Sequence, residues 1–345
     1  MALNMARVWC RCSSYCIKKN NFPNVGVNFL HLSRSVAGYE RDPAPLFFSP
    51  DVQRIMRKMT KVDVKKVFRS RKLGEKLDAP EYKFLTSEEL EQYMKETEKK
   101  VEERLQVPPI VKEREEINEV LSVDRALTGY DSAKFVFTDI TFGVPNKDRI
   151  IVVREPDGTL RKAFWNERFR MNQIYFPEPD RQLRTPHMFE EPYLTNVLDR
   201  GEYEFVLDRA CVQYEPNDPE YYRVTSTTYD HIEKEQMFDA LQSTRHFGAL
   251  AFYLCWNKQI DNFVLYYIQN DRIEDAVMLI QLFHLLNPES KSAETDSKDA
   301  LKFIQAYISK DSSRKSVLEI ALQSFLELQK QRQFVEEGIK KAHGM

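Results

Sequence analysis

The sequence has little glycine, with only ten glycines among its 345 residues. Loops that hold the phosphates of nucleotides usually contain several closely spaced glycines, because a side chain would keep the backbone away from the phosphate. The scarcity argues against a nucleotide-dependent enzyme. The sequence also lacks the G-x-S-x-G, G-K-[ST] and H-E-x-x-H patterns of common hydrolase, phosphate-loop and zinc-protease sites.

Long apolar runs are missing as well. A helix needs about 20 consecutive apolar residues to cross a bilayer. The longest apolar block, 247–256, is bounded by His246, Asn257 and Lys258 and is much shorter than that. We therefore expect no insertion into a membrane.

Cysteine is rare, with five in the chain. Cys10, Cys12 and Cys16 are close in sequence, but no histidine or second cysteine pair follows at the spacing of a zinc finger. We predict no metal site and no cofactor. Cys211 and Cys255 are isolated, which is typical of a reducing compartment and predicts no disulfide framework.

Acidic residues are absent from the N-terminal segment 1–38, and the first carboxylate is Glu40. The basic residues of this segment are Arg7, Arg11, Lys18, Lys19 and Arg34. A serine-bearing, basic segment without acids is typical of a mitochondrial transit peptide, so we predict import into the mitochondrial matrix. The alternative is an ordinary basic tail without a targeting role.

Neither charge dominates the whole chain, which has 51 basic and 53 acidic residues and a net charge of -2. This balance argues against a general binder of polyanions but allows local basic patches. Residues 51–76 hold ten basic and three acidic residues, whereas 77–124 hold seven basic and fourteen acidic ones. In the basic stretch we predict phosphate contacts from Arg54, Arg57, Lys58, Lys65, Lys66, Arg69, Arg71 and Lys72. The alternative is a solvated helix face.

Hydrophobic periodicity gives the expected elements. Val52, Ile55, Met56 and Met59 recur at helical spacing, and Thr86 with Glu89 forms the pattern of a capping box before a charged helix that ends near Val107. Short apolar runs between 134 and 163, interrupted by Pro156-Asp157-Gly158, predict a small antiparallel sheet. A helix is expected over 165–175, and helical patterns dominate from about 228 onward.

These patterns predict an α-dominated α+β fold with N-terminal charged helices, a small antiparallel β-sheet near 134–163 and a C-terminal helical array. The expected segments are a transit peptide (1–38), an extended and helical charged arm (39–128), a small β-containing region (129–227) and a helical domain (228–345).

A second cluster of candidate residues lies in the stretch RIIVVREPDGTLRKAFWNERFRMNQIYFP (149–177), where basic and aromatic residues alternate. Guanidinium groups bind phosphates in a forked geometry, and aromatic rings stack on unpaired bases, so this hairpin could present both to RNA. The candidates are Arg149, Arg154, Arg161, Lys162, Arg168 and Arg170. In the alternative interpretation, the aromatics form a core and the arginines pair with Glu155, Asp157 and Glu167.

No set of residues predicts catalysis. His246 and His284 lie in apolar helical stretches, where a histidine is usually a hydrogen-bonded core or boundary residue, and Cys255 beside Trp256 is typical of a buried thiol. We predict that the protein is not an enzyme.

Several segments resemble one protein family, that of protein twenty-two of the animal mitochondrial small ribosomal subunit. The resemblance extends from about 50 to 286. It rests on PDVQRIMRKMT (50–60), VPPI (107–110), KFVFTDI (134–140), RIIVVREPDGTLRKA (149–163), QIYFP (173–177) and STRHFGALAFY (243–253).

The resemblance implies a non-catalytic structural subunit of the mitochondrial ribosome, a ribonucleoprotein in the matrix. Its expected partners are the small-subunit rRNA and neighbouring small-subunit proteins. The family has no compact binding motif, so the candidate residues come from charge and aromatic patterning alone. The alternatives are a matrix helical adaptor that binds proteins without RNA, and an unrecognised enzyme.

Overall fold

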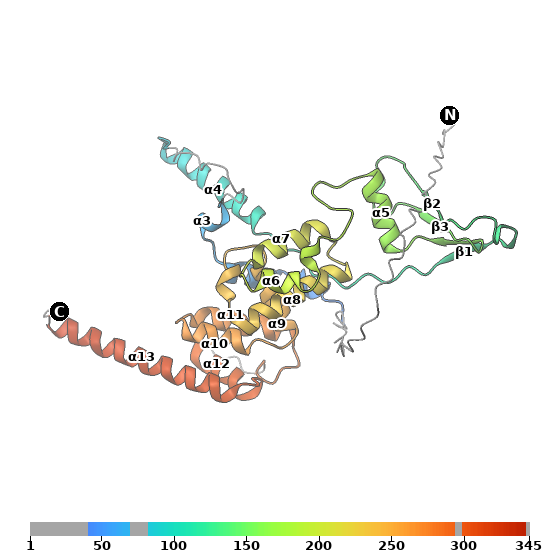
Figure 1. Ribbon diagram of the computed structural model, residues 1–345. Coiled ribbons are helices and arrows are strands. Elements are labelled where there is room, and N and C mark those ends of the chain that lie inside the picture. The colour runs from blue at the N-terminus through green and yellow to red at the C-terminus, as the bar shows by residue number, and fades with distance from the viewer. Residues whose placement is uncertain (1–40, 70–81, 294–298, 343–345) are drawn as a thin grey trace. The chain divides into compact units, whose positions relative to one another are not determined.

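The computed structural model describes residues 41–69, 82–293 and 299–342 (Figure 1). The predicted transit peptide lies outside these residues. The described chain forms two compact units, one made of 114–186 and the other of 41–113 together with the chain from 187 onward. The units thus divide the chain near 114 and 187, whereas composition suggested limits near 128 and 227.

The described residues confirm the predicted fold class, since thirteen α-helices accompany one four-stranded antiparallel sheet. The strands are β1 (Val120–Val123), β2 (Phe135–Thr138), β3 (Ile151–Arg154) and β4 (Thr159–Lys162). The helices are α1 (Ala44–Phe47), α2 (Pro50–Thr60), α3 (Val64–Val67), α4 (Ser87–Arg104), α5 (Trp165–Tyr175), α6 (Tyr193–Leu198), α7 (Tyr203–Gln213), α8 (Pro219–Glu235), α9 (Phe247–Trp256), α10 (Asp261–Gln269), α11 (Ile273–Leu286), α12 (Ala300–Lys310) and α13 (Lys315–Ala342). Short 3-10 turns occupy Arg125–Leu127, His187–Phe189 and Phe238–Leu241.

The sheet has the strand order β1-β4-β3-β2. The β3–β4 hairpin turns at Pro156-Asp157-Gly158, as the sequence predicts, and Gly158 has a φ of +84°. A Cβ atom on Gly158 would lie 2.0 Å from the Asp124 carbonyl oxygen, so the turn needs glycine both for its backbone angle and for this close approach. The Asp124 amide in turn donates to the Gly158 carbonyl at 3.0 Å, which joins the end of β1 to the hairpin.

One face of the sheet carries α5 and a small core. The buried residues of this core are Ile151, Val153, Ala163 and Met171, with Val136 and Tyr175 packed against them. Ile151 and Val153 of β3, which point toward this core, are therefore fully buried. β3 lies between β4 and β2, so it is not an edge strand of the sheet.

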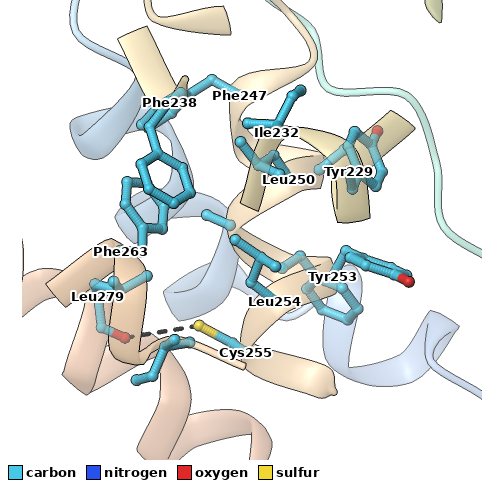
Figure 2. Close-up of a cluster of buried hydrophobic side chains, with 14 of the residues drawn as sticks. Tyr229, Ile232, Phe238, Phe247, Leu250, Tyr253, Leu254, Cys255, Phe263 and Leu279 are labelled. Carbon is cyan, nitrogen blue, oxygen red and sulfur yellow. Dashed lines mark hydrogen bonds between the residues drawn. The ribbon is translucent and has the colours of Figure 1, made fainter. Parts of the chain in front are cut away.

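The helical unit surrounds α9, whose residues Phe247 to Cys255 are all buried. A helix that is apolar on every side is covered on every side. Figure 2 shows side chains of α8, α10 and α11 closing around it, among them Tyr229, Phe263 and Leu279. The Cys255 thiol lies 3.7 Å from the Leu279 carbonyl oxygen and is fully buried, which raises its pKa well above the ordinary value.

Helix α2 packs on α9 through the face that its sequence predicts. Val52, Ile55, Met56 and Met59 are all buried. A Cβ atom on Gly248 of α9 would come within 3.3 Å of the Met56 Cβ, so the absence of a side chain there allows the two helices to approach closely. The opposite face of α2, which is basic, therefore faces solvent.

Candidate nucleic-acid interface

The outward face of α2 presents Arg54, Arg57 and Lys58, all exposed. They lie at i, i+3 and i+4, which places them on one side of the helix. Arg54 pairs with Asp51 at 2.8 Å, but both side chains are more than half exposed. Such a surface pair is worth little, so it leaves the arginine able to exchange its carboxylate for a phosphate.

Two residues of the neighbouring basic run are engaged within the helical unit. Lys66 donates to the carbonyls of Asp239 and Ala240, and burial lowers the pKa of its ammonium group. Arg69 lies 3.4 Å from the Glu204 carboxylate. Lys65 is exposed on α3, and Arg71 and Lys72 lie outside the described residues. The exposed candidates in this unit are therefore Arg54, Arg57, Lys58, Lys65 and Arg69, whose side chain is still 62% exposed beside Glu204.

The end of α2 is held by a buried carboxylate that the sequence analysis did not single out. Asp275 on α11 accepts from the Lys61 ammonium at 2.6 Å and from the Arg272 Nε at 2.6 Å, and its side chain is 5% exposed. An almost buried charge with two cationic partners is well satisfied. Lys61 thus serves to fix α2 on the helical unit.

In the sheet unit, Arg149 and Arg168 are buried, with exposed fractions of 2% and 8%. Arg149 donates to the carbonyls of Asp139, Thr141 and Val144 at 2.7–2.9 Å, and its guanidinium lies 3.6 Å from the centre of the Phe176 ring. Arg168 donates to carbonyls of the loop that leads into β3, including that of Arg149 at 2.8 Å. Both side chains close the 139–149 loop onto the sheet unit.

Arg161 is also an internal residue. Its guanidinium donates to Glu155 at 2.6 Å and to both carboxylate oxygens of Glu167, at 2.8 and 2.9 Å. It also lies 3.7 Å from the centre of the Phe164 ring. The hydrogen bond with Glu167 raises the pKa of Arg161 and lowers that of Glu167. This arrangement matches the alternative interpretation, in which the arginine pairs with carboxylates of its own chain.

The remaining hairpin candidates are more accessible. Arg154 is half-buried and donates to the Gly158 carbonyl at 2.9 Å, and Lys162 is exposed and pairs with Glu119 at 2.5 Å. Arg170 on α5 is exposed and has no ion-pair partner among the described residues. Lys147, another exposed cation of this unit, was missed because it precedes the stretch whose alternating pattern defined the candidates.

The two histidines of the apolar helical stretches, His246 and His284, and the cysteine Cys211 belong to internal networks. His246 is fully buried, its Nε2 lies 2.9 Å from Asp208, and burial lowers its pKa. His284 lies 2.7 Å from the Ser292 hydroxyl, and Cys211 lies 3.5 Å from the Tyr221 hydroxyl. In the described part of the chain, no group of three or more histidine, cysteine or carboxylate side chains is placed to hold a metal ion. The described helices also include none that is long and apolar enough to cross a membrane.

These observations define a class of molecule: a mostly helical α+β protein that presents separate charged surfaces around well-packed interiors. A family model described as "Mitochondrial 28S ribosomal protein S22" matches residues 45–288. The chain belongs to this family, which confirms the resemblance found in the sequence over much the same range.

Two relatives have a name that is another form of this family's name. "Small ribosomal subunit protein mS22" of Bos taurus is 38% identical over 298 residues, covering 86% of this chain and 82% of the relative. The protein of the same name from Mus musculus is 37% identical over 299 residues, covering 86% of this chain and 83% of the relative. The similarity therefore includes both compact units.

Proposed function

We propose that this protein is a non-catalytic structural component of the mitochondrial small ribosomal subunit, in the mitochondrial matrix. In this role it bridges the small-subunit rRNA and neighbouring ribosomal proteins during mitochondrial translation. The observation that carries the proposal is the similarity of 86% of the chain to relatives named as small ribosomal subunit proteins.

The charge distribution supports a bridging role. Exposed cations gather on the outward face of α2, at Arg54, Arg57 and Lys58, while the interior of the helical unit is apolar. Phosphate binding requires local positive charge and does not require a basic protein as a whole. We assign the rRNA-facing role to this face together with Lys65, and in the sheet unit to Lys162 and Arg170.

The buried arginines have a different role in this proposal. Arg149, Arg161 and Arg168 hold the sheet unit in shape, because each guanidinium group already donates to carbonyls or carboxylates of the same unit. A buried guanidinium that left these partners would leave them unsatisfied, at a cost of several kcal/mol. RNA contact is therefore assigned to exposed cations.

Sedimentation of a mitochondrial lysate tests the proposal. We expect the tagged full chain to migrate with the small ribosomal subunit, and to leave that fraction after the rRNA is digested with nuclease. A chain that migrates elsewhere would contradict the ribosomal role. A complex that survives digestion unchanged would support the adaptor alternative, in which the partners are proteins only.

A further inference from the structure

Helix α4 has an apolar stripe that is covered at one end and bare at the other. Leu90, Tyr93, Met94 and Val101 recur at intervals of three, four and seven residues, so they share one face of the helix. Val101 is 7% exposed, whereas Leu90, Tyr93 and Met94 are 49–55% exposed. The same face therefore changes from interior to surface along the helix.

The covered end rests on the short helix α3. Arg104, in the last turn of α4, donates to the Val67 carbonyl at 3.1 Å, and its guanidinium lies 4.5 Å from the centre of the Phe68 ring. These contacts, with the burial of Val101, anchor the C-terminal end of α4. They do not extend to its first two turns, where the stripe is exposed.

The bare end continues into the segment before the helix. Tyr82, Phe84 and Leu85 are exposed, and the Phe84 side chain is fully accessible to solvent. Together with the start of the stripe they form one run of exposed apolar side chains, which we name the Leu90 face: Tyr82, Phe84, Leu85, Leu90, Tyr93 and Met94. Extended apolar surface of this kind usually marks a site of association.

The helix start is shaped without help from another molecule. The Glu89 amide donates to the Thr86 hydroxyl at 3.3 Å and the Thr86 amide donates to the Glu89 carboxylate at 2.8 Å, which completes a capping box. Leu85 and Leu90 occupy the two positions of a hydrophobic staple around that cap. The cap fixes the first turn of the helix, so the helical part of the Leu90 face (Leu90, Tyr93 and Met94) is ordered before any partner arrives, and binding need not supply that ordering.

The charge beside the stripe indicates what kind of partner fits. Glu91, Glu98 and Glu102 are spaced by seven and four residues, so they form an acidic row along one border of the apolar face. Helix α4 as a whole has seven glutamates and four basic residues. An anionic border repels phosphate and attracts lysine and arginine, so the occupant is a protein with basic residues around an apolar patch.

We propose that the Leu90 face is the docking surface for a neighbouring ribosomal protein that presents an apolar patch bordered by lysine or arginine. This inference rests on the proposed ribosomal function, and it assigns protein contact to α4 while the basic face of α2 contacts rRNA. Proteins that neutralise rRNA phosphates carry excess lysine and arginine, which makes them suitable partners for an acidic border.

Site-specific photo-crosslinking tests the docking surface. A benzophenone amino acid replaces Tyr93 in the full-length chain, the small-subunit fraction is collected by sedimentation and irradiated, and the adducts are identified by mass spectrometry. The matched control places the same probe at Gln92, an exposed position on the opposite side of α4. We expect adducts to another protein from position 93, at a yield at least about fivefold above that from position 92.

A charge variant tests the acidic border. Glu91→Lys/Glu98→Lys reverses the row, and Glu88→Lys/Glu103→Lys makes the same charge change on the side of α4 away from the apolar stripe. In chains that also carry the probe at position 93, we expect the first variant to reduce the protein adduct about fivefold and the second to leave it unchanged. All four positions are exposed, and circular dichroism checks that helix content is retained in both variants.

Several results would overturn the docking surface: adducts only to rRNA, adducts only to this chain or to a second copy of it, equal yields at the two probe positions, or equal effects of the two charge variants. These outcomes differ from failure of the proposed function. If the chain is absent from the small-subunit fraction, both ideas fail. If it is present but position 93 gives no adduct to another protein, only the docking surface is wrong.

Discussion

Arg161 and Glu167 face each other in a forked pair, in which two guanidinium nitrogens donate to the two carboxylate oxygens at 2.8 and 2.9 Å. The pair joins β4 to the first turn of α5, where Glu167 also accepts from the Phe164 amide at 2.9 Å. The Arg161 side chain is only 9% exposed. One ion pair thus fixes the helix on the edge of the hairpin and caps its N-terminus.

Removing this arginine should destabilise the sheet unit. We expect Arg161→Leu to lower the free energy of unfolding of the unit by about 3 kcal/mol, because it leaves Glu155 and Glu167 without their main partner. Hydrogen exchange of the β3 and β4 amides in the full-length chain measures this. The control, Arg170→Leu, changes an exposed residue of α5, the helix that carries Glu167, and should alter stability by less than about 0.5 kcal/mol. Equal protection in the two variants would show that the pair contributes nothing.

The same pair predicts a dependence on pH. Hydrogen bonding from Arg161 is the main cause that lowers the pKa of Glu167 below its ordinary value of 4.5. A carboxylate whose pKa is lowered by folding contributes stability that is present above about pH 4.5 and is lost as the pH falls through the folded pKa. Glu167→Gln should therefore weaken the loss of sheet-unit protection in acid. An acid profile identical to that of the unmodified protein would contradict this expectation.

The turn between β3 and β4 allows the cost of a side chain at Gly158 to be compared with its cost at Gly143. Gly158 and Gly143 share a φ of +84°, but a Cβ atom would meet the Asp124 carbonyl only at Gly158, and nothing lies within 4 Å at Gly143. Gly143→Ala should cost about 1 kcal/mol for its backbone angle alone. Gly158→Ala adds a steric clash, so it should cost about 2 kcal/mol or more and release the Asp124 amide. Hydrogen exchange at Asp124 distinguishes the two, and equal losses would mean that the close approach is unimportant.

Local features were predictable because their causes lie within a few residues. The helix over Trp165–Tyr175, the capping box at Thr86 and Glu89 and the turn at Gly158 were all predicted from spacing and residue type, and the structure confirms each of them. The apolar face of α2 was also predicted, since a helix has a fixed period.

Two features could not be predicted because their causes lie far away in sequence. The sequence of strand β1, VLSV, shows no alternation of polar and apolar residues, and all four of its side chains are exposed. The strand forms by pairing with β4, about 40 residues later in the chain. The burial of Arg149 depends on carbonyls of 139–144 and on the Phe176 ring, which only the folded loop brings together. Residue type alone indicated surface cations, whereas the structure buries Arg149, Arg161 and Arg168.

Charge reversal on α2 should weaken incorporation into the small subunit. Arg57→Glu/Lys58→Glu removes two exposed cations that have no ion-pair partner among the described residues, and we expect about tenfold less chain in the small-subunit fraction. The matched variant Lys99→Glu/Lys100→Glu makes the same change on the acidic helix α4, where we expect little effect. Quantitative sedimentation measures both. If the two variants incorporate equally well, the α2 face is not a preferred site of rRNA contact.

The position of the α2 face should depend on Asp275, because this residue holds Lys61 at the end of α2 and Arg272 at the start of α11. Asp275→Asn keeps the size of the side chain but removes its charge, so two cations lose a buried partner, at an expected cost of about 2–3 kcal/mol in unfolding free energy. Denaturant unfolding of the full-length chain measures this, together with hydrogen exchange of the α2 amides, which should lose protection first. Asp271→Asn changes a carboxylate that is 47% exposed and should cost less than about 1 kcal/mol. If Asp275→Asn left α2 as well protected as Asp271→Asn does, the apolar contacts of Met56 and its neighbours alone would position the basic face, and Lys61 would then be an ordinary surface cation.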